Sequence, residues 1–252
     1  MLPEREVRLA VIGDVHAQWM RLDAVLQALR ELHLDAILFV GDLGSHELSY
    51  VRRRTPERDA RYLASVEEIL RRANAVCPNV LYVPGNHDLP ELSFPGNVDG
   101  RVSEVAGLRI GGIGGAGPAR FGFAYEWAES EIRARGRLEC DVLLCHTPPA
   151  RTPLDLLHDG TRHVGSEAVR ELAFEHSGVL VCGHIHESAG AIQLEDCLCA
   201  NVGALGQPFG RAQYALVRHA PELPARFEVR HHDLESGEIR LWRREPSRAR
   251  DN

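Results

Sequence analysis

Lysine is missing from this sequence, and all 29 basic residues are arginines. This absence excludes Schiff-base chemistry and the lysine-dependent phosphate contact of a P-loop. An excess of positive charge is missing as well, because the formal net charge is −7. The chain as a whole therefore lacks the positive field that attracts nucleic acids or anionic lipids.

Long hydrophobic runs are also missing. No apolar run approaches the ~18 residues that a transmembrane helix requires, and the charged first residues precede an apolar run too short for a signal peptide. Six cysteines occur without CxxC spacing, mostly within apolar runs, which favours buried, reduced thiols. Cys197 and Cys199 would share one face of a strand, and a metal site there is the less favoured interpretation. We therefore expect a cytoplasmic protein with no membrane partner.

The organisation of the chain changes about three quarters of the way along it. The first part alternates short apolar runs with amphipathic helical patterns, which predicts a largely parallel sheet, and short strands with turns follow from residue 187. The predicted strands are 7–12, 36–40, 80–83, 102–105, 108–113, 141–145, 179–182, 191–194, 197–202, 214–218, 227–231 and 239–242, and the predicted helices are 19–32, 59–76, 125–135 and 165–175. We predict a single domain over residues 1–252, with a polar tail at 244–252.

Five of the predicted strands end in side chains of metal-binding types. These are Asp14 and His16, Asp42, Asn86 with His87 and Asp88, His146, and His184 with His186, in chain order. In parallel α/β sheets the carboxyl ends of the strands lie at one edge, where ligands bind. Each group alone has an ordinary interpretation as a helix cap or a loop residue, but together they indicate one site at that edge.

The residue types at these strand ends suit a pair of metal ions. Two divalent cations about 3.5–4 Å apart can clamp a phosphoryl group together with the attacking oxygen. Such a pair needs carboxylates to balance its charge, and neutral nitrogen or amide oxygen ligands to complete each coordination sphere. Four imidazoles among the ligands favour Mn, Fe, Zn, Co or Ni over Ca and Mg.

The ordered series of motifs resembles the calcineurin-like metallophosphoesterase superfamily. The motifs are D-x-H at 14–16, G-D at 41–42, G-N-H-D at 85–88, H at 146 and G-H-x-H at 183–186. The resemblance extends to the small prokaryotic members and the brain-type branch of the superfamily, which contains phosphodiesterases. It implies an α/β fold, the four-layer α/β/β/α double β-sandwich of the metallo-dependent phosphatases. Protein Ser/Thr phosphatase activity is not expected, because Gly41-Asp42 continues as Leu-Gly-Ser-His-Glu.

The resemblance also implies a role for each residue. The implied first metal site comprises Asp14, His16 and His186, the second comprises Asn86, His146 and His184, and Asp42 bridges them. His87 would donate a proton to the leaving oxygen, with Asp88 orienting its ring, which suits an imidazole near neutral pH. A metal-bridging hydroxide would be the nucleophile.

From these observations we predict a dinuclear metal-dependent phosphoesterase. Its expected partner is a small phosphodiester or phosphomonoester, with a diester slightly preferred and cyclic nucleotides among the candidates. A nuclease is the alternative enzyme, and the net charge of −7 counts against nucleic acid as the partner. A non-catalytic binding module on the same fold is less favoured, because such a module would be expected to have lost ligands or the active-site histidine.

A glycine-rich stretch offers a competing motif. Residues 112–117 match GxGxxG after a strand, but no helix opens there and no matching second strand with an acidic end follows. We interpret the segment beginning at Gly111 as a flexible loop that rims the metal site. It leads into residues 120–123, where Arg120 and the phenyl rings could contact a phosphate and a base, although Phe121 and Phe123 are favoured as core or loop anchors. His46 is a candidate outer-site residue after Asp42, although a solvated loop histidine is the favoured interpretation.

Overall fold

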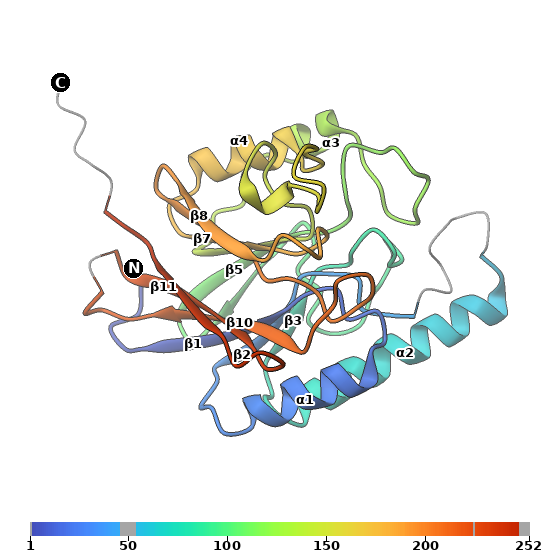
Figure 1. Cartoon of the computed structure of the whole chain (residues 1–252), viewed down its shortest axis with the longest axis horizontal. Coiled ribbons are helices and arrows are strands. Elements are labelled where there is room, and N and C mark those ends of the chain that lie inside the picture. The colour runs from blue at the N-terminus through green and yellow to red at the C-terminus, as the bar shows by residue number, and fades with distance from the viewer. Residues whose placement is uncertain (1, 46–53, 224, 247–252) are drawn as a thin grey trace.

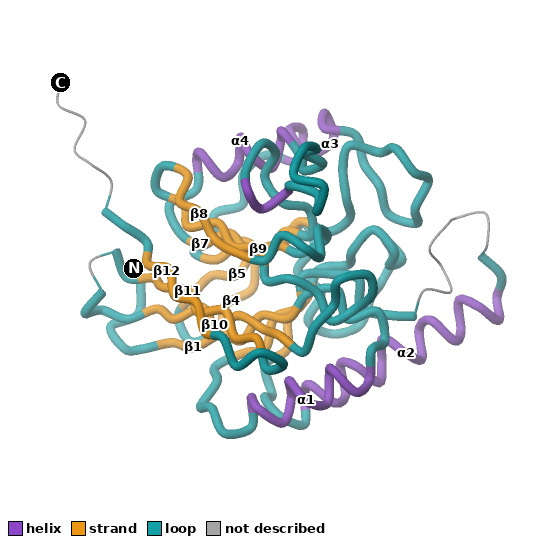
Figure 2. The backbone as a smooth tube through the Cα atoms, in the orientation of Figure 1, coloured by secondary structure: helices purple, strands orange, loops and turns teal. Residues whose placement is uncertain are grey.

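Two six-stranded sheets pack face to face and are covered on their outer sides by helices (Figure 1). The computed structural model describes residues 2–45, 54–223 and 225–246, so that the candidate outer-site residue His46 lies outside the described residues. The layers follow the order helix, sheet, sheet, helix, with the strands in the middle of the molecule (Figure 2). This arrangement is the predicted four-layer α/β/β/α double β-sandwich.

The first sheet contains the N-terminal parallel strands and the C-terminal antiparallel ones. Its strands are β1 (Val7–Ile12), β2 (Ala36–Phe39), β3 (Val80–Tyr82), β10 (Gln213–His219), β11 (Phe227–Asp233) and β12 (Ile239–Arg243). They lie in the order β12-β11-β10-β1-β2-β3, with β1 to β3 parallel and β10 antiparallel to β1. Helices α1 (Trp19–Leu29) and α2 (Pro56–Asn74) cover its outer face.

The second sheet is built from the middle of the chain. Its strands are β4 (Val102–Val105), β5 (Leu108–Ile113), β6 (Val142–Cys145), β7 (Val179–Cys182), β8 (Gly190–Leu194) and β9 (Cys197–Asn201). They lie in the order β4-β5-β6-β7-β9-β8, and β5, β6, β7 and β9 are parallel. Helices α3 (Glu129–Arg135) and α4 (Glu167–Glu175) and the short 3₁₀ helix η3 (Pro153–Asp155) lie on its outer side.

The strands have continuous apolar runs in the sequence because most of them are covered on both faces. Along β1, Leu9 and Val11 pack into the core between the sheets, while Ala10 and Ile12 pack against α1 and α2. A third apolar cluster fills the space between the second sheet and its helices. No helix in the described ranges is long and apolar enough to cross a membrane.

Two expectations from the sequence need correction. The five strand ends do not belong to one sheet, because β1, β2 and β3 lie in the first sheet and β6 and β7 in the second. A strand–helix alternation is local and cannot show which sheet a strand joins. The helix predicted at 125–135 begins only at Glu129, because the backbone of Tyr125 and Trp127 instead pairs with Ala116, through Ala116 N–H to Tyr125 O at 3.1 Å and Trp127 N–H to Ala116 O at 3.0 Å.

Candidate metal centre

The strand ends of both sheets meet at one end of the sandwich. The Asp14 N–H donates to Gly41 O at 3.2 Å, which joins the loops after β1 and β2. Across the sheets, the His184 N–H donates to the Asp14 carboxylate at 2.9 Å. The Gly183 N–H donates to His146 O at 3.1 Å, which joins the loops after β6 and β7. The single edge expected from the sequence is therefore formed by two stacked sheets.

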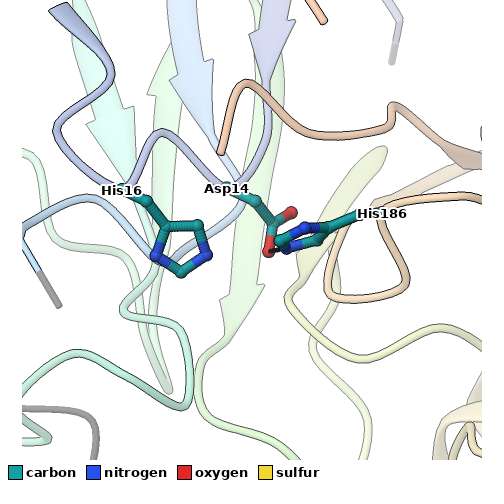
Figure 3. A group of neighbouring side chains, drawn as sticks. All are labelled: Asp14, His16 and His186. Carbon is teal, nitrogen blue, oxygen red and sulfur yellow. Dashed lines mark ion pairs between the residues drawn. The ribbon is translucent and has the colours of Figure 1, made fainter. Parts of the chain in front are cut away.

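The three residues of the implied first metal site lie together (Figure 3). Asp14, His16 and His186 each offer one ligand atom, and these atoms all lie within 4.8 Å of one another. His186 Nε2 is 3.3 Å from Asp14 Oδ1. Its Nδ1–H faces the carbonyl oxygen of Pro208 at 2.8 Å. A histidine held through one ring nitrogen presents the other to a metal ion.

The residues of the implied second site converge on one amide oxygen. Asn86 Oδ1 is 2.8 Å from His146 Nε2 and 3.0 Å from His184 Nδ1. The other nitrogen of His146, Nδ1, lies 2.7 Å from the carbonyl oxygen of Val40, which orients the ring. An amide oxygen and two imidazole nitrogens at these separations could serve as neutral metal ligands.

Asp42 stands between the two sets. Its Oδ2 lies 3.5 Å from His16 Nε2 and 3.6 Å from His146 Nε2. Its Oδ1 accepts the His87 N–H at 2.8 Å, so the carboxylate is held in this orientation. Asp14, Asp42 and His146 also form a second group of ligand atoms that lie within 4.8 Å of one another. Asp42 is therefore within reach of both sets of candidate ligands.

The backbone at this end of the sandwich adopts conformations that L-residues rarely take. The φ angles of Asp14, His16, Asp42 and His184 are 45°, 46°, 51° and 67°. Left-handed backbone at non-glycine residues costs free energy and gathers at functional sites. With buried carboxylates balanced by imidazole and amide donors, the seven residues fit a pair of metal ions.

Burial and neighbouring charges shift the pKa values of the candidate ligands, and the net direction differs from residue to residue. Burial and the repulsion of His146 lower the pKa of His184 to about 3, which leaves a neutral imidazole. Burial acts to raise the pKa of Asp14, but the hydrogen bond and attraction of His186, with the attraction of His146 and His16, together hold that pKa below its usual range. Burial acts to lower the pKa of His186, but the Asp14 carboxylate, the Pro208 carbonyl and Asp42 together raise this pKa to about 9.

Metal uptake is expected to strengthen as the pH rises from 7 toward 9. Below its pKa of about 9, metal-free His186 carries a proton that must leave before Nε2 can bind a metal ion. One released proton corresponds to an affinity gain of up to about tenfold per pH unit. Calorimetric titration of Mn²⁺ across this pH range, in buffers of different ionisation enthalpy, measures the gain and the proton. In a His186→Asn variant, the part of the pH dependence that comes from the His186 proton should be absent. A wild-type Mn²⁺ affinity that does not change with pH would contradict the assignment of His186 as a metal ligand.

His87 and Asp88 lie beside the metal centre in different surroundings. His87 Nε2 is 3.9 Å from Asp42 Oδ2, and 21% of its side chain is exposed. Asp88 is buried, and its carboxylate accepts the N–H of Gly85 at 2.8 Å, the N–H of Leu43 at 3.1 Å and the hydroxyl of Tyr62 at 2.7 Å. Asp88 thus joins the loops after β2 and β3, a task that its expected role of orienting the His87 ring did not include.

Tyr62 is a residue that the sequence reasoning missed. It lies on the buried face of α2, and its hydroxyl reaches Asp88 in the loop after β3. Burial and the Asp88 carboxylate raise the pKa of Tyr62, which keeps the hydroxyl a donor. The available signal was a tyrosine at a core position of an amphipathic helix, because a buried phenolic hydroxyl requires a partner.

The glycine-rich segment does rim the site, but it is anchored rather than loose. Gly114 N–H donates to Asp99 Oδ1 at 2.9 Å and Gly115 N–H to Pro84 O at 2.9 Å. The indole N–H of Trp127 donates to Gly114 O at 2.9 Å. Since residues 112–113 finish β5 and the next α-helix begins only at Glu129, the segment lacks the helix start that a dinucleotide site needs.

The cysteines remain outside the metal centre. All six are free thiols, and Cys197 and Cys199 share one face of β9 with their sulfurs 3.5 Å apart. A hydrogen bond with Cys197, together with burial, raises the pKa of Cys199, which disfavours the thiolate that binds metals. Within the described residues, neither group that could hold a metal ion contains a cysteine.

Gly183→Ala should weaken metal binding, because the Asp14 carboxylate packs directly against this glycine and leaves no room for a side chain. A Cβ at position 183 would lie 2.2 Å from Asp14 Oδ2, so the carboxylate would have to move. We expect an affinity loss of about tenfold or more and a free energy of unfolding lower by about 1–3 kcal/mol. Gly190→Ala is the matched control, since the nearest atom to its Cβ is 4.0 Å away. Equal metal affinities of the two variants, measured by calorimetry, would contradict this role of Gly183.

Comparisons with known proteins bear on the family and the fold of the chain. A family model described as calcineurin-like phosphoesterase matches residues 7–188. One solved structure is 17% identical, with 95% of this chain and 100% of that chain covered and a TM-score of 0.69. TT1561 of Thermus thermophilus is also 17% identical, with 94% and 98% covered and a TM-score of 0.56. GAP50, the anchor in the inner membrane complex of Plasmodium, is 12% identical, with 98% and 90% covered and a TM-score of 0.56.

These structural likenesses show the fold alone, because the sequence identities are low. No curated protein matches the chain in sequence.

Proposed function

The chain belongs to the calcineurin-like phosphoesterase family, and from this premise we propose that it hydrolyses small phosphoesters with the help of two metal ions. The observation that carries the proposal is the convergence of seven ligand side chains from two sheets, with Asp42 between two sets of three. Mn, Fe or Zn suits the nitrogen and oxygen donors best, and Co and Ni are also compatible.

The protein's own residues have separate tasks in the proposed reaction. When bound, the two ions would polarise the phosphoryl group and make water a nucleophile at neutral pH. Asp14 and Asp42 offset their positive charge, and the imidazoles and Asn86 complete the ligand set. His87, partly exposed beside Asp42, donates a proton to the leaving oxygen. Asp88 and Tyr62 hold the backbone that places His87.

The substrate of the proposal is a small phosphodiester or phosphomonoester, with a diester slightly preferred and cyclic nucleotides included, and the compartment is the cytoplasm. A nuclease is the second enzymatic candidate, but the net charge of −7 does not supply the phosphate-binding field that nucleic acids require. A binding module without activity is a third candidate, since GAP50 is described as an anchor. The complete ligand set and His87 favour an enzyme.

Metal analysis combined with a phosphoester panel tests the proposal. We expect the purified protein to contain Mn, Fe or Zn and to hydrolyse bis-p-nitrophenyl phosphate, with 2′,3′- and 3′,5′-cyclic nucleotides in the panel. Removal of the metal with a chelator should abolish hydrolysis, and adding Mn²⁺ back should restore it. A metal-free protein that takes up none of these ions would overturn the dinuclear site. Loaded protein without hydrolysis would favour the binding module.

A further inference from the structure

An apolar cavity of about 180 Å³ opens directly beside the metal centre. His184, a predicted metal ligand, forms part of its lining. Apolar walls come from Phe121 on one loop, Leu157 and Val164 on a second, and Ile185 on the loop after β7. A cavity of about 150 Å³ accommodates a benzene ring, so this space is large enough for one aromatic group.

The wall on the Phe121 side is a preformed loop. The carboxylate of Glu126 accepts the backbone N–H groups of Phe121 at 3.1 Å, Gly122 at 2.7 Å and Phe123 at 3.3 Å. These bonds hold the loop in a shape that leaves the Phe121 ring 64% exposed. A large apolar side chain held in water beside a cavity is typical of a ligand-binding surface rather than of a core anchor.

A series of rings connects this loop to the reacting centre. The Phe123 ring lies 4.4 Å from the His87 ring, between centroids, and Phe121 lies 5.7 Å from Phe123. The cavity is therefore lined by His184, a predicted metal ligand, and by Phe121, whose ring neighbours the Phe123 ring that contacts the proposed acid. A phosphoester bound at the metals would direct its organic part toward this cavity.

The wall formed by Leu157 and Val164 is also held in place by backbone hydrogen bonds. The Val164 N–H donates to Asp155 O at 3.1 Å, and the Leu157 N–H donates to Arg162 O at 2.9 Å. Arg120 and Glu126 also line the mostly apolar cavity; the Glu126 carboxylate accepts the loop's backbone N–H groups, and Arg120 supplies hydrogen-bond donors. Apolar walls, one exposed phenyl ring and a guanidinium suit a planar aromatic group with acceptors at its edge.

We propose that this cavity, which we call the side pocket, binds a planar aromatic group of the substrate while the phosphate lies at the metal centre. The inference rests on the proposed phosphoesterase function and narrows its substrate class to aromatic phosphoesters. A nucleobase and a simple aryl group share the required chemistry. Phe121 would determine specificity by stacking on the ring, a type of contact that tolerates different bases.

Inhibition constants of three phosphate monoesters test the side pocket. AMP, phenyl phosphate and ribose 5-phosphate each compete with bis-p-nitrophenyl phosphate in the Mn²⁺-loaded protein. We expect AMP, phenyl phosphate or both to bind about tenfold more tightly than ribose 5-phosphate, because only they offer a ring to stack. Tighter binding of AMP alone indicates a nucleobase, and tighter binding of phenyl phosphate alone indicates an aryl group.

Variants test whether stacking in the side pocket is the reason that aromatic ligands bind more tightly. Phe121→Ala removes the exposed ring, and Val164→Trp fills the cavity from the loop that carries Leu157 and Val164. In both variants the inhibition constant of ribose 5-phosphate, divided by that of the aromatic ligand, should fall close to one. Phe174→Ala on α4 is the matched control, since this ring is 41% exposed but stacks with Arg170, and its ratio should stay as in the wild type. Equal binding of the three ligands, or a ratio that both variants leave unchanged, would overturn the proposal.

Failure of the side pocket can be distinguished from failure of the phosphoesterase proposal. If no metal supports hydrolysis, the proposed function is wrong, and the three ligands are titrated calorimetrically against the Mn²⁺-loaded protein instead. A preference for the aromatic ligands that Phe121→Ala abolishes would then support the side pocket without catalysis. Equal affinities in that titration would overturn it.

Discussion

Asp42→Asn is expected to lower metal affinity by at least about 100-fold at one of the two ions and to abolish hydrolysis. Replacing a residue that merely supports a metal ligand typically costs 10–100-fold, and Asp42 is placed to act as a ligand of both ions. Its Oδ2 lies between His16 Nε2 at 3.5 Å and His146 Nε2 at 3.6 Å. Without its charge, Asp14 alone among the seven ligands would balance the cations.

Asparagine is the informative replacement because it preserves the local backbone. Asp42 Oδ1 accepts the His87 N–H at 2.8 Å, and an amide oxygen can accept the same bond. The measurement is elemental analysis and calorimetric Mn²⁺ titration, with circular dichroism to verify the fold. Asp141→Asn is the control, since Asp141 pairs with Arg109 at the opposite end of β6. Two ions bound with unchanged affinity in Asp42→Asn would contradict a bridging role.

His87→Ala is expected to retain both metal ions and to lose about 10²- to 10⁴-fold in kcat, the range typical of a general acid. His87 is not a member of the implied ligand set, and its ring stands beside Asp42 at the partly exposed side of the centre. Asn86→Ala provides the contrast at the neighbouring position. Its Oδ1 lies within 3.0 Å of two histidine nitrogens, so this variant should lose metal.

The leaving group separates proton donation from a general structural effect. A p-nitrophenolate leaves readily without a proton, whereas an alkoxide requires one. We therefore expect the kcat loss in His87→Ala to be larger for an alkyl phosphoester than for bis-p-nitrophenyl phosphate. Equal losses for both substrates would rule out the acid role, and equal metal loss in His87→Ala and Asn86→Ala would contradict the division of tasks between them.

The identity and order of the candidate ligands followed from the sequence because each is a local feature. A buried strand reads as an apolar run, and the residues directly after it are visible as Asp14, Asp42 or His146. Glycines at 13, 41, 85 and 183 mark the turns, and a Cβ on Gly85 would lie 2.1 Å from Asp42 Oδ1. The chemistry of a metal centre could therefore be inferred before its geometry was known.

The connections among these loops could not be inferred, because they join residues distant in the chain. Asp88 receives the hydroxyl of Tyr62 across 26 positions, and the Asp14 carboxylate receives the His184 N–H across 170. A residue type shows that a polar group requires a partner, but not which partner the packing brings within reach. For the same reason the sequence favoured Phe121 and Phe123 as anchors, whereas the structure exposes one ring and sets the other against His87.

By itself the sequence determined the α/β class, the strand ends and the donor atoms, since periodicity and strand-terminal residues are properties of short segments. Only the tertiary structure decided that these ends come from two stacked sheets, that Asp42 lies between the two sets of ligands, and that a cavity opens beside His184. The physical reason is that burial of apolar faces selects which strands pair and which sheets stack. The distances between side chains at the strand ends are a consequence of that packing.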